Sequence, residues 1–567
     1  MTQNYKKYKG NIMTQDIVGR ECKFVMHVPA KGYDGTDVHI VKEQLHMADG
    51  TMKPNLRFIK DFKRPIYIVK PNKRNYEQKK ECEHIDDLLM KSVTQSKLRD
   101  EIARSLDKQW SRDPIRQLCR SPYVYGADIP STSFIKRMYD QKFPNHKSNY
   151  SVATFDIETD VLFGTNDIIV ASVVFKNQVF TAVVKEFVQG FSMVDTLFHQ
   201  MAHTYIGDYI AKRNMTLNLY IAEDPVDLIR AIFNKIHEWK PDFLAIWNMD
   251  FDIPRVIEVL EKYKVDPADI LCDPSVPKEF RLCKYRQGRK KKITASGKVQ
   301  PINPANQWHT LQCTAGYYVI DAMCVYRQIR LAQQEESSYS LDAILEKELG
   351  IRKLKFTEAD GYSGLKWHQV MQSDYRIQYL IYNIFDCVSM LELDDKIKDL
   401  SSTLPSFAAT TDFSRFNSQP TRIAGALYWF AAEKGLILGS VGASDPEDED
   451  SEDETLALSG WIVTLPAHMS IPGMTCIEED ETIHTNIRCF AFDADATAAY
   501  PSATSVCNVS KATTVRELIA VDGIEETTFR MQNINLLLGH TNALDYSITM
   551  FGLMKPEEML AHFNNTP

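Results

Sequence analysis

Two acidic residues, Asp156 and Glu158, lie two positions apart in the run Val152-Ala-Thr-Phe-Asp-Ile-Glu158, which has the composition of a β-strand. Side chains alternate along a strand, so both carboxylates should project from one face while Phe155 and Ile157 turn to the core. Carboxylates this close repel each other unless a cation lies between them, and oxygen ligands favour a hard divalent metal. The pair therefore predicts a metal site, although a solvated strand face gives the same pattern in most proteins.

Two further stretches carry residues that such a site would use. Asp252 follows an expected strand and precedes an expected helix that starts near Pro254, so it could instead cap that helix. Tyr382 and Asp386 are spaced i, i+4 in an expected helix over 375–393 and therefore share one helix face. A surface pair is the alternative interpretation of that spacing.

Together, these four carboxylates and one tyrosine suit phosphodiester hydrolysis with two metal ions, either Mg²⁺ or Mn²⁺. In such a reaction one ion lowers the pKa of the attacking water, and both stabilise charge on the phosphoryl oxygens and the leaving 3′ oxygen. The ions are predicted to bind Asp156, Glu158, Asp252 and Asp386, and Tyr382 to orient the water or the scissile phosphate.

The elements that must position these residues alternate in type along the chain. The sequence predicts strands at 151–159, 168–175, 179–184 and 243–247, and helices at 226–239 and 375–393. Strands that alternate with helices predict an α/β domain that continues to about residue 400.

The chain has 567 residues, which is the length of three or four domains of roughly 100–200 residues each. Its net charge is −9, but residues 1–150 carry 29 Lys/Arg against 18 Asp/Glu, and the remainder carries 37 against 57. This asymmetry is expected when one part of a protein binds the phosphates of a nucleic acid and another part carries a cluster of acidic residues. Two ordinary domains of different pI would give the same numbers.

Composition excludes several classes of protein. The eleven cysteines are scattered and form no C-x-x-C pair, which argues against a disulfide framework or a zinc ribbon. No apolar run approaches the roughly 18–20 residues that span a bilayer, and the N-terminus leads into no apolar signal region. We therefore expect an intracellular protein without a membrane partner.

Four segments are expected. Residues 1–150 mix short β-runs such as Ile66–Val69 with a charged helical stretch around Glu81–Leu106, without a catalytic constellation. Residues 151–400 form the α/β domain, and residues 401–455 a connector that ends in the acidic run Asp445–Glu454, which is expected to be a solvated loop. A further domain is expected over 456–567.

In their order and spacing, Phe155-Asp-Ile-Glu158, Asn248-x-x-Phe-Asp252 and Tyr382-x-x-x-Asp386 resemble the three motifs of DnaQ-type 3′–5′ exonucleases. The surrounding sequence resembles the proofreading domain of bacteriophage family-B DNA polymerases, with supporting stretches at Tyr318–Asp321, Ser338–Asp342 and Leu349–Leu354. The second motif has two residues between Asn248 and Phe251 where that family often has three, so Asp250 is a less favoured substitute for Asp252.

The resemblance implies a fold and a location. It implies an α/β multidomain protein in the host cytoplasm, with an RNase H-like 3′–5′ exonuclease domain built on a mixed sheet. An N-terminal α+β domain and an incomplete palm would flank the exonuclease domain.

A basic run lies between the second and third motifs. Seven of its twelve residues are basic, arranged around Gln287-Gly288: Arg281, Lys284, Arg286, Arg289, Lys290, Lys291 and Lys292. Family-B polymerases resemble this chain in placing here a β-hairpin that helps to move the primer end to the exonuclease site. A basic tip would contact phosphates of single-stranded or primer-template DNA without reading sequence, and a charged surface loop is the plainer alternative.

The stretch Phe490–Ser502 resembles motif A of family-B polymerases. By that resemblance Asp495 would bind the polymerase metals, and the Tyr500 ring would pack under the sugar of an incoming dNTP. The remaining residues that match this nucleotide-binding region are Pro501, Ser502 and Asn508.

The sequence contains neither the D-T-D-S turn of motif C nor the fingers motif K-x-x-x-N-S-x-Y-G. One carboxylate cannot assemble a two-metal polymerase site, so this chain alone is not expected to polymerise DNA. We expect the exonuclease-bearing part of a split polymerase that binds dNTP only when a second chain completes it. A sliding clamp and other replisome proteins are candidate partners. The alternatives are a catalytically weak scaffold that binds DNA and the second chain, and the product of an interrupted gene.

Overall fold

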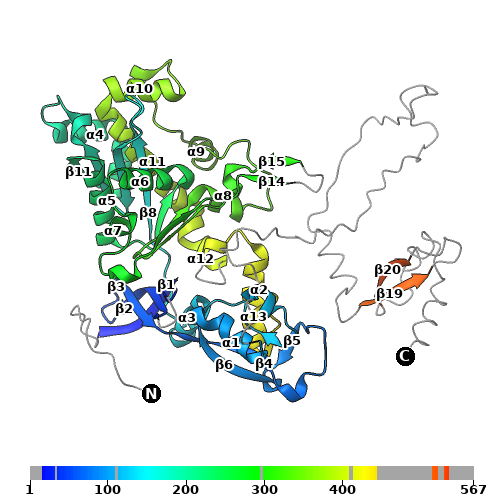
Figure 1. The fold of residues 1–567 in the computed structure, drawn as a ribbon. Coiled ribbons are helices and arrows are strands. Elements are labelled where there is room, and N and C mark those ends of the chain that lie inside the picture. The colour runs from blue at the N-terminus through cyan, green and yellow to red at the C-terminus, as the bar shows by residue number, and fades with distance from the viewer. Residues whose placement is uncertain are drawn as a thin grey trace, which may run out of the picture. The chain divides into compact units, whose positions relative to one another are not determined.

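The computed structural model describes residues 16–31, 35–108, 113–293, 298–407 and 413–442, together with two later strands, β19 (Thr514–Ala520) and β20 (Phe529–Asn535) (Figure 1). The chain divides into two compact units, residues 1–451 and 452–567, and β19 pairs antiparallel with β20 in the second unit. Of the helices within these described ranges, none combines the length and the apolar composition needed to cross a bilayer.

The N-terminal region combines antiparallel sheets with short helices. One sheet has the order β1–β2–β3 and another the order β6–β4–β7. The elements are β1 (Ile17–Val28), β2 (Val38–Met47), β3 (Met52–Lys60), β4 (Lys63–Val69), β5 (Cys82–His84), β6 (Leu88–Thr94), α1 (Leu98–Ser105), α2 (Ile115–Cys119), β7 (Val124–Tyr125) and α3 (Ser131–Lys142).

The helical stretch predicted around Glu81–Leu106 is wrong for most of its length. The segment β6 is a strand because it pairs with β4 along its entire length, and a helix begins only at Leu98. Cross-strand pairing thus outweighs the local helical composition of this charged segment.

The segment expected to be a connector, 401–455, contains regular structure, and part of it packs on the N-terminal region. It includes α12 (Leu404–Phe407), α13 (Gln419–Glu433) and β18 (Leu436–Leu438). Strand β18 pairs antiparallel with β5, and Tyr428 and Trp429 of α13 make edge-on contacts with the Phe134 ring of α3. The chain therefore returns to its N-terminal region after the central domain. The acidic run Asp445–Glu454 lies outside the described residues.

A mixed six-stranded sheet forms the centre of the next domain, in the order β11–β10–β9–β8–β12–β17. Strand β8 pairs antiparallel with β9 and parallel with β12, so it lies inside the sheet. The strands are β8 (Val152–Thr159), β9 (Ile168–Phe175), β10 (Gln178–Val184), β11 (Thr216–Ala222), β12 (Phe243–Ile246) and β17 (Tyr318–Asp321). This mixed α/β arrangement confirms the predicted fold class and fits an RNase H-like fold.

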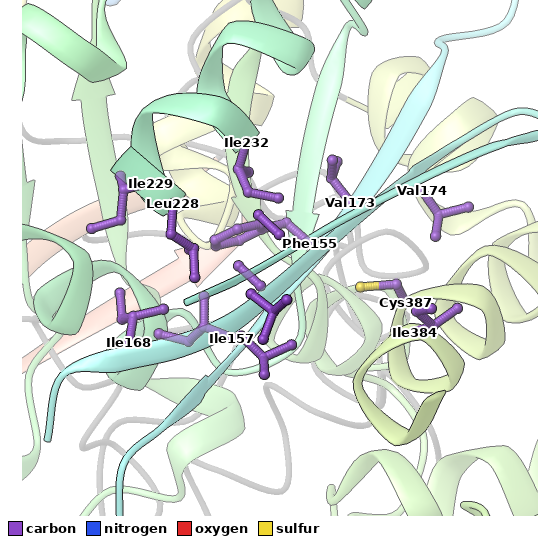
Figure 2. Close-up of a cluster of buried hydrophobic side chains, with 14 of the residues drawn as sticks. Phe155, Ile157, Ile168, Val173, Val174, Leu228, Ile229, Ile232, Ile384 and Cys387 are labelled. Carbon is purple, nitrogen blue, oxygen red and sulfur yellow. The ribbon is translucent and has the colours of Figure 1, made fainter. Parts of the chain in front are cut away.

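Two long helices cover opposite faces of the sheet, α5 (Pro225–Trp239) and α11 (Arg376–Ile397). Figure 2 shows Leu228, Ile229 and Ile232 of α5 on one side of the strands, and Ile384 and Cys387 of α11 on the other. The ring of Phe155 contacts Phe233 of α5, whereas Thr154 Oγ1 donates to the Cys387 carbonyl of α11 at 2.8 Å. The face of β8 that carries Thr154 therefore also turns Asp156 and Glu158 toward α11.

The remaining helices of this domain surround the sheet. They are α4 (Val194–Arg213), α6 (Met249–Lys262), α7 (Pro267–Leu271), α8 (Ala322–Ile329), α9 (Leu341–Leu349) and α10 (Gly364–Asp374). Helix α6 begins at Met249, five residues before the predicted start at Pro254, so this proline lies inside the helix. Met249 and Ile253 are both fully buried, and this packing favours helix ahead of the proline.

A two-stranded antiparallel ribbon lies between α7 and α8 in the sequence, and it is built from two successive pairs of strands. Strand β13 (Cys283–Arg286) pairs with β16 (Thr310–Cys313), and further out β14 (Lys291–Ile293) pairs with β15 (Val299–Pro301). We call residues 283–293 and 298–313 the basic arm. The hairpin expected here is present as this ribbon, and Gln287-Gly288 lies between β13 and β14 on its outgoing side.

Gly288 allows the two sides of the basic arm to approach closely. A Cβ atom at this position would lie 1.6 Å from the Gln307 carbonyl oxygen, which is a backbone atom that cannot rotate away. We therefore expect Gly288→Ala to force the two sides apart and to destabilise the arm by about 1–3 kcal/mol. Limited trypsin digestion should then cleave faster after Lys290, Lys291 and Lys292, which are exposed.

Gly207→Ala is the matched control for that substitution, because a Cβ there has no atom within 4 Å. Gly207 lies inside α4, so its replacement should leave the protein as stable or up to about 1 kcal/mol more stable. Equal trypsin cleavage rates in the wild type and Gly288→Ala would contradict the predicted clash.

His39 of β2 makes the N-terminal region sensitive to acid. The side chain is fully buried, and its Nε2 shares a hydrogen bond of 2.7 Å with Ser131 Oγ. Burial, aided by the charge of His27, lowers the pKa of His39 from 6.5 to about 3. Below pH 6.5 the unfolded state therefore binds a proton that the folded state rejects, and stability falls as the pH is lowered from 6.5 toward 3.

At pH 5 we expect this histidine alone to cost the protein about 1–2 kcal/mol of unfolding free energy relative to pH 7. Denaturant unfolding of the wild type and of His39→Gln at both pH values checks the prediction, because glutamine can still bond to Ser131 but does not titrate. Identical losses of stability in the two proteins would show that His39 is not the group responsible.

Candidate metal-dependent active site

Three carboxylates from two distant parts of the sequence meet between β8 and α11. Asp156 and Glu158 come from the strand, Asp386 comes from the helix, and one oxygen of each lies within 4.8 Å of the others. Within the described ranges, no other group of three or more histidine, cysteine or acidic residues meets this distance. The structure therefore brings together three of the four predicted metal ligands.

The fourth predicted ligand, Asp252, is not part of this group of three, although the charge of Glu158 acts on its carboxyl group. It lies in the first turns of α6 with only 3% of its surface exposed. Burial, followed by the charges of Glu158 and Asp321, raises its pKa well above the usual range. The capping alternative does not hold, because α6 already begins at Met249 and Asn248 occupies the cap position.

The less favoured substitute, Asp250, is bound to the basic arm. It accepts hydrogen bonds from the Tyr285 hydroxyl at 3.0 Å and from the Gln287 amide, and it pairs with Lys290 Nζ at 2.9 Å. Although burial opposes it, these bonds together lower the pKa of Asp250. Asp250 therefore anchors the arm to the start of α6 as a carboxylate.

Lys353 and Tyr382 complete the immediate surroundings of Asp386. Lys353 Nζ donates to Asp386 Oδ2 at 2.6 Å and to the Tyr382 hydroxyl at 3.2 Å. Burial and the charge of Asp386 raise the pKa of Tyr382, so this phenol keeps its proton at neutral pH. The pKa of Lys353 is also raised: burial opposes its charge, but the Asp386 carboxylate more than compensates.

The three clustered carboxylates repel one another strongly. Burial raises the pKa of Asp156 well above its usual range, and the charges of Asp252, Asp386 and Glu158 raise it further. Burial raises the pKa of Glu158 to about 8, even though a hydrogen bond from Tyr379 opposes the shift. Burial also raises the pKa of Asp386, against the opposing charge of Lys353. Without a further cation, the cluster would hold protons at neutral pH.

A divalent cation fits this cluster by the chemistry of its donors. All the donors are carboxylate oxygens, which hard cations prefer, and Asp386 Oδ1 is buried without a hydrogen-bond partner in the structure. Lys353 balances one of the three negative charges, which leaves a formal charge of −2 for one divalent ion to balance. A buried oxygen without a partner is costly unless an ion or water binds it.

Four residues around the cluster were not singled out from the sequence: Lys353, Gln372, Tyr379 and Asn383. Asn383 Nδ2 donates to Asp156 Oδ2 at 2.7 Å, and the Tyr379 hydroxyl donates to Glu158 Oε2. Both lie three residues before a predicted site residue in α11, so the helical i, i+3 spacing could have identified them. Lys353 lies in the stretch Leu349–Leu354 that supports the resemblance, whereas Gln372 lies in no stretch that carries it.

The seven basic residues predicted to contact DNA have different surroundings. Arg281 is mostly buried and its Nη1 lies 2.8 Å from Asp269 Oδ1, so it braces α7 rather than the arm. Arg286 is half-buried. The exposed members are Lys284, Arg289, Lys290, Lys291 and Lys292, all within the basic arm. The predicted polymerase residues, Asp495, Tyr500, Pro501, Ser502 and Asn508, lie outside the described residues.

The chain was compared with known proteins and protein families. No curated protein matches it. The model of the exonuclease domain of DNA polymerase family B matches residues 125–344. This match covers Asp156, Glu158 and Asp252 but ends before Asp386, which the fold brings to the first two. It supports a 3′–5′ exonuclease function and implies DNA binding: residues 125–344 are similar to the exonuclease domain of DNA polymerase family B.

Proposed function

We propose that this chain is a metal-dependent 3′–5′ exonuclease that proofreads for a family-B DNA-directed DNA polymerase. The observation that carries the proposal is the convergence of Asp156, Glu158 and Asp386 within 4.8 Å, in a domain that matches a polymerase exonuclease. When bound, Mg²⁺ or Mn²⁺ would activate a water and stabilise charge on the scissile phosphate. Two ions would require Asp252 in addition to the three clustered carboxylates.

The chain's own residues would orient the reacting groups. The Tyr382 hydroxyl accepts from Lys353, so its own proton is directed elsewhere and is available to a phosphate oxygen or the attacking water. Lys353 also restrains Asp386 through a second hydrogen bond. In the proposed reaction the water attacks phosphorus, the bond to the 3′ oxygen breaks, and that oxygen receives a proton.

The basic arm would hold the DNA substrate by its backbone. Lys284, Arg289, Lys291 and Lys292 are exposed along it, and lysine and arginine bind phosphates regardless of base sequence. The arm is anchored at Asp250, two residues before Asp252. This anchor would fix the position of a bound DNA strand relative to the carboxylates.

Degradation of a 5′-labelled single-stranded oligonucleotide tests the exonuclease proposal. With Mg²⁺ or Mn²⁺ the protein should produce a ladder that shortens from the 3′ end, and EDTA should abolish it. A 3′-labelled substrate should release its label as mononucleotide at the first step. Folded protein that binds the oligonucleotide but yields no ladder with either metal would instead favour the scaffold alternative.

We also propose that DNA synthesis needs a second polypeptide that supplies the fingers and the second palm carboxylate. The reason is chemical: Asp495 alone cannot hold the two ions of a polymerase site. A mixture with a candidate second chain should form a complex that extends a primer with dNTPs, and Asp495→Asn should abolish extension but leave the exonuclease intact. No association at micromolar concentration would contradict the proposal.

A further inference from the structure

Gln372 of α10 connects the metal cluster to the loop that follows β8. Its side chain is 2% exposed, and both ends of the amide are used. Oε1 accepts from the backbone N–H groups of Val161 at 3.0 Å and Leu162 at 3.3 Å. Nε2 donates to the Thr159 carbonyl at 2.8 Å and to the Tyr379 hydroxyl at 3.3 Å. An amide with four directed bonds is fixed in one orientation.

Tyr379 carries this constraint to Glu158. The side chain is fully buried, and its hydroxyl donates to Glu158 Oε2. Besides the bond from Gln372, the same oxygen shares a hydrogen bond of 2.8 Å with His368 Nδ1 of α10. Gln372 Nε2 donates to this oxygen, and when His368 Nδ1 carries its proton it donates as well, so the Tyr379 hydroxyl proton then points toward Glu158. The Glu158 carboxylate is thus held by a hydrogen bond from outside the three clustered carboxylates.

Hydrogen bonds to the Asp160 side chain order the loop over 159–165, which follows β8. Asp160 Oδ1 accepts from the backbone N–H of Leu162 and Phe163, and Oδ2 accepts from the backbone and hydroxyl of Thr165. Phe163 is 84% exposed at the tip of this loop. The loop is therefore ordered by the hydrogen bonds of Asp160 and Gln372 and not by packing of the Phe163 side chain.

We propose that Tyr379 and Gln372 are positioning residues that hold Glu158 in its metal-binding orientation and tie that orientation to the loop over 159–165. The inference rests on the proposed exonuclease function, since it assigns these residues a role in that site. Neither residue would touch the ion or the DNA.

The expected effect follows from the freedom that a glutamate side chain has without such a restraint. An unrestrained Glu158 would sample several rotamers, and metal binding would then have to select one of them. Partners that hydrogen-bond to metal ligands typically contribute 10–100-fold to metal affinity or activity. The loss of the single bond from Tyr379 is therefore expected to weaken metal binding by about tenfold.

The test compares Mn²⁺ binding to the full chain and to Tyr379→Phe, measured by calorimetry without DNA. Mn²⁺ bound by a variant that carries both Asp156→Asn and Glu158→Gln is subtracted, because the acidic run over 445–454 can also bind cations. Tyr139→Phe is the matched control: Tyr139 is another buried tyrosine that donates to a carboxylate, Glu43 Oε2 at 2.7 Å, in the N-terminal region. We expect tenfold weaker binding in Tyr379→Phe and no change in Tyr139→Phe.

Kinetics separate positioning from a general loss of structure. For Tyr379→Phe, saturating Mn²⁺ should restore most of kcat, and the KM for single-stranded DNA should not change. Gln372→Met should weaken Mn²⁺ binding in the same direction. The double variant should be no weaker than Tyr379→Phe alone, because both residues act through one bond. Thermal unfolding of each variant establishes that it is folded.

The outcomes distinguish this inference from the proposed function. A folded wild-type protein without nuclease activity in either Mg²⁺ or Mn²⁺ would overturn both. An active wild type in which Tyr379→Phe binds Mn²⁺ within twofold of Tyr139→Phe would overturn the positioning role alone. Additive losses in the double variant would show that Gln372 acts independently of Glu158 and would overturn the connection.

Discussion

Replacement of Asp156 by Asn together with Glu158 by Gln is expected to lower the rate of single-stranded DNA degradation by roughly two to three orders of magnitude or more. The amides keep the size of both side chains but carry no charge, so the cluster can no longer balance a divalent cation. Metal stabilisation of a phosphoryl transition state amounts to several kcal/mol, and each roughly 1.4 kcal/mol is a tenfold change in rate. The measurement is the initial rate of 3′ nucleotide release with Mg²⁺.

The same variant is expected to be at least as stable as the wild type when metal is absent. Burial and mutual repulsion raise the pKa of both carboxyls, so their charged forms oppose folding. Mg²⁺ should raise the unfolding temperature of the wild type but not that of the variant, because only the folded wild type binds it. A variant that still degrades DNA at the wild-type rate would remove these residues from the mechanism.

Asp252→Asn is expected to lower nuclease activity by about a hundredfold or more, whereas Asp250→Asn should have little effect on a short single-stranded substrate. The two positions lie two residues apart in the first turns of α6 but face different partners. Asp252 is buried, and burial together with the charge of Glu158 raises its pKa. Asp250 instead binds Tyr285, Gln287 and Lys290 of the basic arm.

The pair of variants controls for damage to α6, because both make the same chemical change in the same helix. Asp250→Asn should instead loosen the arm and increase its cleavage by trypsin. If Asp250→Asn were the more damaging change for nuclease activity, the assignment of the second motif would have to move to Asp250.

The sequence could predict those parts of the site that depend on local geometry. Strand alternation indicated that Asp156 and Glu158 share a face, and helical spacing placed Tyr382 and Asp386 together. The predicted start of α6 at Pro254 rests on the preference of proline for a first turn, whereas the buried side chains of Met249 and Ile253 extend the helix ahead of it. Local propensity is overridden by packing that the sequence does not display.

Contacts between remote segments could not be predicted in the same way. Lys353 lies in a segment without regular structure, and only the packing of that segment against α11 brings it to Asp386. The resemblance implied a hairpin at the basic arm, and the structure has a ribbon there, but nothing in the sequence indicated a reason for a glycine at position 288. Gly288 lets the backbone of Gln307 approach closely, and this depends on a loop segment nearly twenty residues further along the chain.

The residues of the site lie far apart in the sequence, so the ribosome synthesises them at different times. The hydrogen bond between Asp156 and Asn383 joins residues 227 positions apart, and Asp386 lies further still. At roughly 5–20 residues per second, a ribosome needs on the order of 10–45 s to pass from one to the other. During that interval the nascent chain carries two carboxylates but not the third. The proposed nuclease therefore remains inactive until α11 has emerged from the ribosome and packed against β8.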